Sequence, residues 1–300
     1  MGDTTNIEWA DSTYNHWEGC TKISPACDHC YAADRAARYK SVEWGGPRRL
    51  LSKANQKKPF RWERQSNNFY AENGRRRRVF CSSLSDVFDN QVPKEWRDDL
   101  WNIIRECPSM DWLLLTKRPQ NIEKMKPSFW NEIKDRIWLG ATAENQENLD
   151  RAYSYLSRQD SAIIFLSMEP LLSSVDLHRG GWSVLKDMKP PKGKMRRGFD
   201  WVIAGGESGP NARPSNPEWF VSIQMDCEAA GVAFLFKQWG EWVPEENLPE
   251  EVSISTYTAD LKAGKTYRFI GNPMRRVGKK RAGRVLDGKT YDGFPTAKVA

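Results

Sequence analysis

Three cysteines stand close together near the start of the chain, Cys20, Cys27 and Cys30, in the arrangement C-x6-C-x2-C. Three thiolates on one short loop can bind three irons of a cubane, which leaves the fourth iron open to a small molecule. S-adenosylmethionine can coordinate that iron through its amino and carboxylate groups, so that one electron breaks a carbon–sulfur bond. The spacing therefore favours a [4Fe–4S] cluster that acts on S-adenosylmethionine.

Other chemistries compete for the same thiols. A structural zinc ion usually takes four protein ligands, so His16 or His29 would have to supply the fourth. A redox dithiol would need only Cys27 and Cys30 and would leave Cys20 unexplained, and unligated thiols are a further alternative. The other three cysteines fall in strand and helix patterns and are expected in the core: Cys81, Cys107 and Cys227.

The composition is that of a globular protein with reduced thiols. Of the 300 residues 39% are hydrophobic, yet no run of about 18 apolar residues occurs, so we expect neither a transmembrane helix nor a membrane partner. The polar N-terminus has no secretory signal pattern, which predicts a cytoplasmic protein. Thiols clustered in a reducing cytosol favour metal or redox roles over disulfides.

Positive charge is concentrated in two segments. Residues 40–78 carry twelve Lys and Arg against three acidic residues, and residues 268–289 carry eight against one, although the whole chain has a formal charge of only +7. Such asymmetry is expected of a protein that binds a polyanion. A solvated surface with loose basic loops is the alternative. The positive segments therefore lead us to expect a nucleotide or nucleic-acid partner.

Short, nearly continuous apolar runs alternate with amphipathic segments, which predicts buried parallel strands joined by helices in right-handed βαβ units. The expected helices are residues 94–107, 145–156 and 217–230. The expected strands are residues 13–15, 79–83, 112–117, 137–142, 162–167, 201–206 and 232–237. About seven such strands predict an α/β fold built as a full or partial (β/α) barrel. An open doubly wound sheet stays an alternative, because the sequence does not reveal strand order.

Two regions interrupt this alternation within a barrel predicted for residues 1–244. Residues 40–78 are expected to form an irregular basic insert, and residues 178–199, with Gly180-Gly181 and Pro190-Pro191, a long surface loop. After Trp242 the alternation stops. Residues 245–300 are expected to form a small, basic, β-rich extension.

Polar side chains close the predicted strands, and the cysteine loop follows the first of them. Because the carboxyl ends of parallel strands meet at one edge, we expect these groups to form one site. Lys117 and Arg118 are candidates to bind a carboxylate or phosphate, with surface ion pairing as the alternative. Thr142 and Asn145 are candidates for ribose hydroxyls, or for capping the next helix.

Later strands end in similar groups. Gly205 and Gly206 would let backbone approach a ligand and Glu207 would offer a polar contact, although a tight turn explains the same residues. Lys237 follows an apolar run and is expected to emerge into a site. Glu169 and Lys237 are therefore the candidates for catalytic groups on the substrate side.

The chain resembles an uncharacterised phage-associated family whose members are similar to radical S-adenosylmethionine enzymes. The likeness spans nearly the whole chain and is carried by residues 7–32, 205–209 (GGESG), 237–240 (KQWG) and 283–288 (GRVLDG). The usual radical motif is C-x3-C-x2-C, so this chain departs from it in the first interval. In that motif an aromatic residue near adenine precedes the third cysteine, and His29 takes that place here.

The resemblance implies a cofactor site of a particular kind. Radical enzymes carry a Gly-Gly-Glu-like segment after the second strand, where it holds the methionine amino group. This chain lacks that triplet, so Ser83 and Asp86 are the expected substitutes. The implied activity is formation of a 5′-deoxyadenosyl radical that abstracts hydrogen, with electrons from an external donor. The expected substrate is a nucleobase, a nucleotide or a modified DNA base, and the alternative is a non-catalytic, zinc-stabilised nucleic-acid-binding protein.

Overall fold

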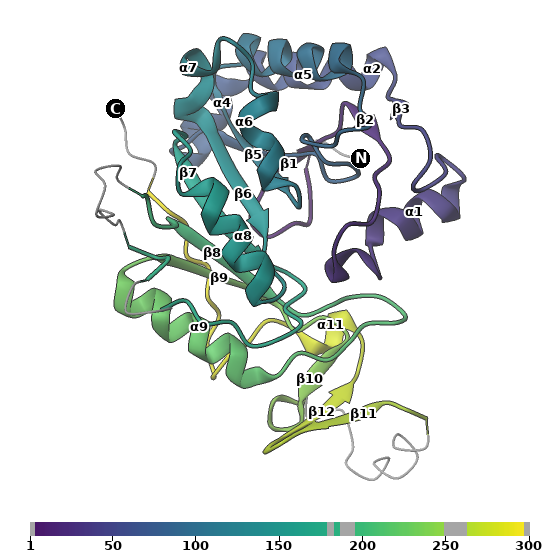
Figure 1. Ribbon diagram of the computed structural model, residues 1–300, viewed down its shortest axis with the longest axis vertical. Coiled ribbons are helices and arrows are strands. Elements are labelled where there is room, and N and C mark those ends of the chain that lie inside the picture. The colour runs from purple at the N-terminus through teal and green to yellow at the C-terminus, as the bar shows by residue number, and fades with distance from the viewer. Residues whose placement is uncertain (1–3, 179–182, 187–195, 249–262, 297–300) are drawn as a thin grey trace.

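A seven-stranded parallel sheet forms the centre of the computed structural model, which describes residues 4–178, 183–186, 196–248 and 263–296 (Figure 1). Its strands follow one another in the order β1-β4-β5-β6-β7-β8-β9. Their bounds are β1 Ser12–Tyr14, β4 Arg77–Cys81, β5 Met110–Thr116, β6 Ile137–Thr142, β7 Ile163–Met168, β8 Trp201–Gly205 and β9 Ala233–Gln238. Each predicted strand is confirmed to within a few residues.

The strand order decides between the predicted architectures. Every parallel neighbour in the sheet is also the next main strand along the chain, whereas a doubly wound sheet reverses direction at a switch point. The doubly wound alternative is therefore wrong. Because β1 and β9 are the two edges of the sheet, the structure is a partial barrel and the full barrel is not formed.

The three predicted long helices are present as α5 (Lys94–Glu106), α8 (Gln146–Leu156) and α9 (Pro217–Ala230). The Asn145 side chain accepts a hydrogen bond from the Asn148 amide at the start of α8, and Asn216 caps α9 in the same manner. Buried side chains of all three helices pack in one large cluster with one face of the sheet. The helices therefore cover that face (Figure 1).

The opposite face of the sheet carries its own smaller core. Strand residues alternate between faces, so Val202 and Ala204 pack under the helices while Trp201 and Ile203 point to the other side. There Trp201 stacks at an angle on Phe294, with ring centroids 5.1 Å apart. Segments from near both ends of the chain thus close this face below the carboxyl ends of the strands.

The expectation of an irregular segment at residues 40–78 is wrong. This stretch contains the short strand β3 (Arg49–Leu50), which pairs with β2 (Trp17–Glu18), and three short helices. The helices are α2 (Lys53–Gln56), α3 (Lys58–Arg64) and α4 (Ser66–Asn73). Pro59 in the first turn of α3 and the left-handed Gly74 after α4 mark their limits. Helices of four to eight residues are too short to show a clear hydrophobic period, which is why the pattern was missed.

The chain beyond the parallel sheet forms a second, antiparallel sheet in the order β10-β12-β11 and then returns to β9. Its strands are β10 (Trp242–Pro244), β11 (Thr266–Phe269) and β12 (Asn272–Arg276), followed by α11 (Lys279–Ala282). On the return, the Gly293 amide donates to the Phe234 carbonyl at 2.9 Å. Much of the predicted 178–199 loop, and residues 249–262 and 297–300 of the predicted extension, lie outside the described residues.

Shorter helices complete the described chain: α1 (Tyr31–Tyr39), α6 (Ile122–Met125) and α7 (Trp130–Ile133). Single 3₁₀ turns occur at Pro25–Cys27, Pro119–Asn121, Lys134–Arg136 and Glu245–Asn247. None of the helices in the described part of the chain combines the length and the apolar character that crossing a bilayer requires.

Gly140, in the middle of β6, gives a test of the packing beneath the site. A Cβ atom at this position would lie 2.2 Å from a ring carbon of Phe165. We expect Gly140→Ala to lower the free energy of unfolding by about 1–3 kcal/mol through overpacking, as measured by urea unfolding. The double variant Gly140→Ala/Phe165→Leu should recover part of that loss. Unchanged stability of the single variant would contradict this packing.

Candidate functional site

The three clustered cysteines line one cavity at the carboxyl ends of the parallel strands, with a volume of about 410 Å³. Cys27 ends the 3₁₀ turn Pro25–Cys27 and is buried, whereas Cys30 immediately precedes helix α1. All three are free thiols. The predicted core cysteines, Cys81, Cys107 and Cys227, are buried and are not in the lining.

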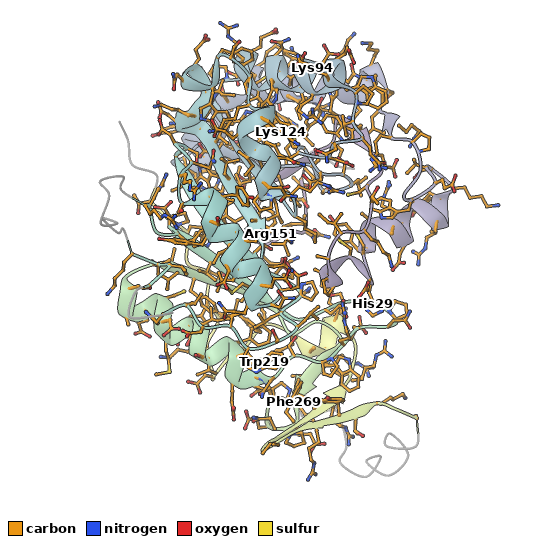
Figure 2. All side chains as sticks on the ribbon, in the orientation of Figure 1. His29, Lys94, Lys124, Arg151, Trp219 and Phe269 are labelled. Atoms are coloured by element: carbon orange, nitrogen blue, oxygen red, sulfur yellow. The ribbon has the colours of Figure 1, made fainter. Side chains whose placement is uncertain are left out.

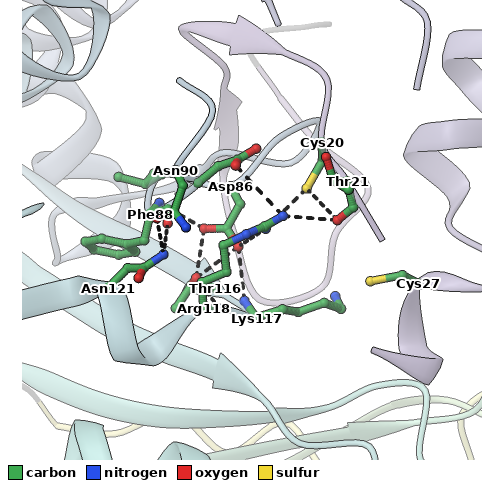
Figure 3. A network of polar contacts seen from close by, with 12 residues as sticks. Cys20, Thr21, Cys27, Asp86, Phe88, Asn90, Thr116, Lys117, Arg118 and Asn121 are labelled. Carbon is green, nitrogen blue, oxygen red and sulfur yellow. Dashed lines mark hydrogen bonds and ion pairs between the residues drawn. The ribbon is translucent and has the colours of Figure 1, made fainter. Parts of the chain in front are cut away.

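Arg118, at the end of β5, holds the first cysteine in place (Figure 3). Its Nη1 donates to the Cys20 sulfur at 3.4 Å, and its Nη2 donates to the Thr21 carbonyl at 3.0 Å. Burial and the charge of Asp86 raise the pKa of Cys20 to about 11, although Arg118 opposes both effects. Burial alone would lower the pKa of Arg118, but the charges of Asp86 and Cys20 raise it above its ordinary value. A permanent cation therefore lies beside this sulfur.

Asp86 orients that guanidinium. Its Oδ2 accepts from Arg118 Nη1 at 3.1 Å and from the Lys117 amide at 3.1 Å, while the Thr116 hydroxyl lies 2.8 and 2.9 Å from the two oxygens. Phe88 contributes a further backbone amide at 2.9 Å. Because both carboxylate oxygens have partners within the protein, this geometry favours a positioning role for Asp86 over the predicted contact with a methionine amino group.

A second buried ion pair extends this network, and it leaves no local pattern from which it could be predicted. Arg48 Nε donates to Asp89 Oδ2 at 2.8 Å, and its Nη2 donates to the Thr21 hydroxyl at 2.7 Å. Asp89 also lies 3.9 Å from Arg118. Thr21, next to Cys20, is therefore held by two guanidinium groups, one on its carbonyl and one on its hydroxyl.

The other end of the cysteine loop is clamped from the end of β8. Glu207 accepts three hydrogen bonds from Arg213: from its amide at 2.7 Å, Nε at 2.9 Å and Nη2 at 2.6 Å. Arg213 in turn donates to the Pro25 carbonyl at 2.8 Å, and Glu207 lies 3.0 Å from His29 Nδ1. Arg213 also pairs with Asp28 at 3.2 Å. Arg213 was missed from sequence because it stands in a polar loop far from the cysteines.

Glu144, which follows β6, supplies a third attachment. Its Oε1 accepts from the Ala26 amide at 3.3 Å and from Asn148 Nδ2 at 2.7 Å. The side chain is only 1% exposed. The cysteine loop is thus fixed by groups from the ends of β5, β6 and β8, which the partial barrel brings to one edge.

The two predicted substrate-side groups, Glu169 and Lys237, form an ion pair in the lining of the cavity. Lys237 Nζ lies 2.8 Å from Oε1 and 2.9 Å from Oε2 of Glu169, although the two residues are far apart in sequence. Gln238 Nε2 donates to Glu169 at 3.1 Å and to the Ser208 hydroxyl at 2.9 Å. Each member of the ion pair keeps 16% of its side chain exposed. The pair therefore presents an ammonium donor and a carboxylate acceptor together.

Lys117 differs from its neighbour Arg118 in having no carboxylate partner among the described residues. Its half-buried side chain lines the cavity, and Figure 3 shows it extending toward Cys27. Ser83 and Thr142 add hydroxyl groups to the same lining. Lys117 is therefore available to an anionic ligand, whereas the guanidinium of Arg118 is already used.

Every predicted site residue lines this cavity except Asn145 and Gly205. The Asn145 side chain caps α8. Gly205 and Gly206 serve packing between the strand ends: a Cβ on Gly206 would lie 1.9 Å from the Trp239 carbonyl oxygen, and one on Gly205 would lie 3.1 Å from that of Gln238. Close backbone packing against the end of β9 therefore accounts for these two glycines, and neither lies in a turn.

His16, a predicted fourth ligand for zinc, belongs to the core. Its Nδ1 lies 2.9 Å from the Tyr14 hydroxyl, its ring packs edge-on against Trp17, and it does not line the cavity. Burial lowers the pKa of His16 to about 4, which keeps the ring neutral. His29 does line the cavity, but its Nδ1 is paired with Glu207.

The three free thiols are donors of the chemical type that an iron–sulfur cluster takes. Across the described residues, no three side chains among His, Cys, Asp and Glu gather closely enough to hold one metal ion. Zinc gathers its ligands around a single ion, whereas a cubane places each thiolate on a different iron. Three thiolates on a cluster also concentrate negative charge, which the cations of Arg118 and Lys117 would offset. Sulfur-directed hydrogen bonds such as the one from Arg118 are among the features that tune such clusters.

Comparison with known proteins identifies a family whose function is unknown. A family model described as "Protein of unknown function (DUF5131)" matches residues 4–295. No curated protein matches the chain. Among solved structures, a spore photoproduct lyase mutant with bound AdoMet and dinucleoside spore photoproduct aligns with a TM-score of 0.40 and 9% identity, covering 91% of this chain and 72% of the other.

Glu207 gives a pH-dependent test of the clamp. Burial raises the pKa of Glu207, but the bonds from Arg213 and His29 lower it overall, below its ordinary 4.5. A carboxylate with a depressed pKa stabilises the folded state above its unfolded pKa and loses that contribution as the pH falls. We expect Glu207→Gln to lower the free energy of unfolding by about 1–3 kcal/mol at pH 7, with a gap to wild type that narrows below about pH 4.5.

The control for this test is Asp28→Asn, which removes the half-exposed carboxylate that also pairs with Arg213. It should change the free energy of unfolding by less than about 1 kcal/mol. A gap between wild type and Glu207→Gln that is equal at pH 7 and pH 4 would count against the ion-pair clamp.

Proposed function

This chain belongs to the DUF5131 family of proteins of unknown function, and we propose that it is a radical S-adenosylmethionine-type enzyme. One observation carries the proposal: Cys20, Cys27 and Cys30 all line a single cavity at the carboxyl ends of a partial β/α barrel. That edge is where β/α folds place their catalytic groups. A structural metal site would gain nothing from a cavity lined by so many polar and charged side chains.

The three thiolates would hold a [4Fe–4S] cluster. When bound, this group would supply the electron that cleaves S-adenosylmethionine to methionine and a 5′-deoxyadenosyl radical. The protein's own part is to fix the sulfurs and balance their charge. Arg118 does both for Cys20, and the Glu207–Arg213 clamp fixes the loop on the far side. An external electron donor remains part of the proposal.

S-adenosylmethionine carries a carboxylate, and Lys117, which lines the cavity without a carboxylate partner among the described residues, can bind it. Thr142 at the end of β6 and Ser83 after β4 offer hydroxyl groups for its ribose and amino group. His29 is held by Glu207 in the wall of the same cavity, where its ring can pack against adenine. The cavity size falls within the range of small-molecule and cofactor sites.

Glu169 and Lys237 would act on the substrate side. Their ion pair offers a hydrogen-bond donor and an acceptor about 3 Å apart, an arrangement suited to a polar edge such as that of a nucleobase. Gln238 holds Glu169 in place from the next position of β9. The proposed reaction is hydrogen abstraction from a nucleobase, a nucleotide or a modified DNA base.

The metal content tests this proposal directly. After anaerobic reconstitution we expect about four irons per chain, with an electron paramagnetic resonance signal that changes when S-adenosylmethionine is added. Single substitutions Cys20→Ala, Cys27→Ala and Cys30→Ala should each lose most of the iron. Cys227→Ala, at a buried position of α9, should keep it and serves as the matched control. One tightly bound zinc per chain and no response to S-adenosylmethionine would refute the proposal.

Lys117→Ala separates cofactor binding from cluster binding. Loss of a charged hydrogen bond to the carboxylate should raise the S-adenosylmethionine concentration needed for the spectral change by roughly tenfold or more. The iron content should stay at the wild-type value, because Lys117 makes no bond to a cysteine sulfur in the described structure. Equal titrations for Lys117→Ala and wild type would rule out this role.

A further inference from the structure

The two basic segments use their charge in different ways. In the first segment, Arg75 donates from both terminal nitrogens to Asp11, and Arg48 is buried against Asp89. Arg78 lies over the rings of Phe294 and Trp138, at 3.7 and 5.5 Å from their centroids. Burial lowers the pKa of Arg78 to about 10. These three arginines therefore stabilise the fold and are not available to an external polyanion.

The second segment holds a different kind of cation. Helix α11 consists of Lys279, Lys280, Arg281 and Ala282, and its three cationic side chains are exposed. None of the three has a carboxylate partner or other side-chain bond within the described part of the chain. Three adjacent, unneutralised cations on one helical turn repel one another, so an anionic ligand would be favoured there.

The position of α11 is fixed by β9 and the turn after it. The Trp239 amide donates to the Gly283 carbonyl at 3.1 Å, and the amides of Val277 and Gly278 donate to the Glu241 carbonyl at 3.0 and 3.1 Å. These bonds place Lys279 in the lining of the cavity that contains the cysteines. His29 of the cysteine loop, labelled in Figure 2, lines the same cavity. The cations therefore lie at the mouth of the proposed catalytic site.

We propose that α11 binds the phosphates of a nucleic-acid strand whose reacting nucleobase enters the cavity. This inference rests on the proposed function for its catalytic meaning, and it names the substrate class. Lys279 lines the cavity, but Lys280 and Arg281 lie outside its lining. A free nucleotide within the cavity would leave those two cations unused, whereas a strand continues past the mouth with a charge at every nucleotide.

An aromatic side chain in the cavity supports the same substrate. Trp44 lines the cavity and is half-buried, so one ring face can stack on a base without sequence preference. Together, an aromatic surface inside and phosphate-binding cations outside match the two ends of a nucleotide unit. An acidic peptide would satisfy α11 but not Trp44.

The test is binding of a fluorescently labelled 12-nucleotide single-stranded DNA to the reconstituted full-length protein, followed by anisotropy from 50 to 200 mM salt. The variant Lys280→Gln/Arg281→Gln should bind roughly 10- to 30-fold more weakly at 0.1 M salt, with a salt slope smaller by about 1.4, because two phosphate contacts are lost. The matched control, Lys94→Gln/Lys124→Gln, removes the same charge from exposed sites far from His29 (Figure 2). It should bind like wild type.

Iron content and the response to S-adenosylmethionine are measured on the same samples. A failure of the proposed function can therefore be distinguished from a failure of the proposed DNA binding by α11. Both readouts should be unchanged in Lys280→Gln/Arg281→Gln. If the two double variants lose equal affinity, or if DNA fails to bind while both readouts are normal, the role of α11 is overturned. Competition by thymidine monophosphate or polyglutamate as effective per charge as by unlabelled DNA would also overturn it.

Discussion

The buried pair of Arg118 and Asp86 is the interaction on which the site depends. Each side chain is only 6% exposed, and removing two such charges from water is costly unless hydrogen bonds satisfy them. Here Asp86 also accepts from the Thr116 hydroxyl and two backbone amides, and Arg118 also donates to the Cys20 loop. The same bonds that offset the desolvation of the charges fix a sulfur at the carboxyl end of β5.

The parallel sheet makes this arrangement possible. Side chains at the ends of β5, β6 and β8 reach one loop because consecutive strands lie side by side and point in the same direction. The alternation of strand residues fills both faces with apolar groups, so polar groups are left at the strand ends. Two different attachments therefore hold the cysteine loop. The guanidinium of Arg118 bonds Cys20, and the Glu207–Arg213 pair bonds Pro25 and His29.

The positively charged side chains of this protein fall into two groups, those that are paired within the fold and those that are exposed beside the cavity. Arginines of the first basic segment are taken up by Asp11, Asp89 and aromatic rings, where a planar guanidinium packs and hydrogen-bonds at once. The exposed cations of α11 have no such partners in the described chain and stand at the cavity mouth. A count of basic residues does not separate the arginines that are taken up inside the fold from the exposed cations beside the cavity.

The sequence by itself determined the strands, the long helices and the cysteine cluster, because hydrophobic period and residue spacing are local properties. It also placed Glu169, Lys237, Lys117 and Arg118 at strand ends, where parallel topology brings side chains together. Only the tertiary structure decided that the barrel is partial, that Asn145 caps a helix, and that Gly206 packs against Trp239. It also revealed Arg48 and Arg213, since Asp89, 41 residues from Arg48, and Pro25, 188 residues from Arg213, leave no local pattern. Pairs of side chains that are distant in sequence form because of how the helices and strands pack together. A short stretch of sequence therefore cannot predict them.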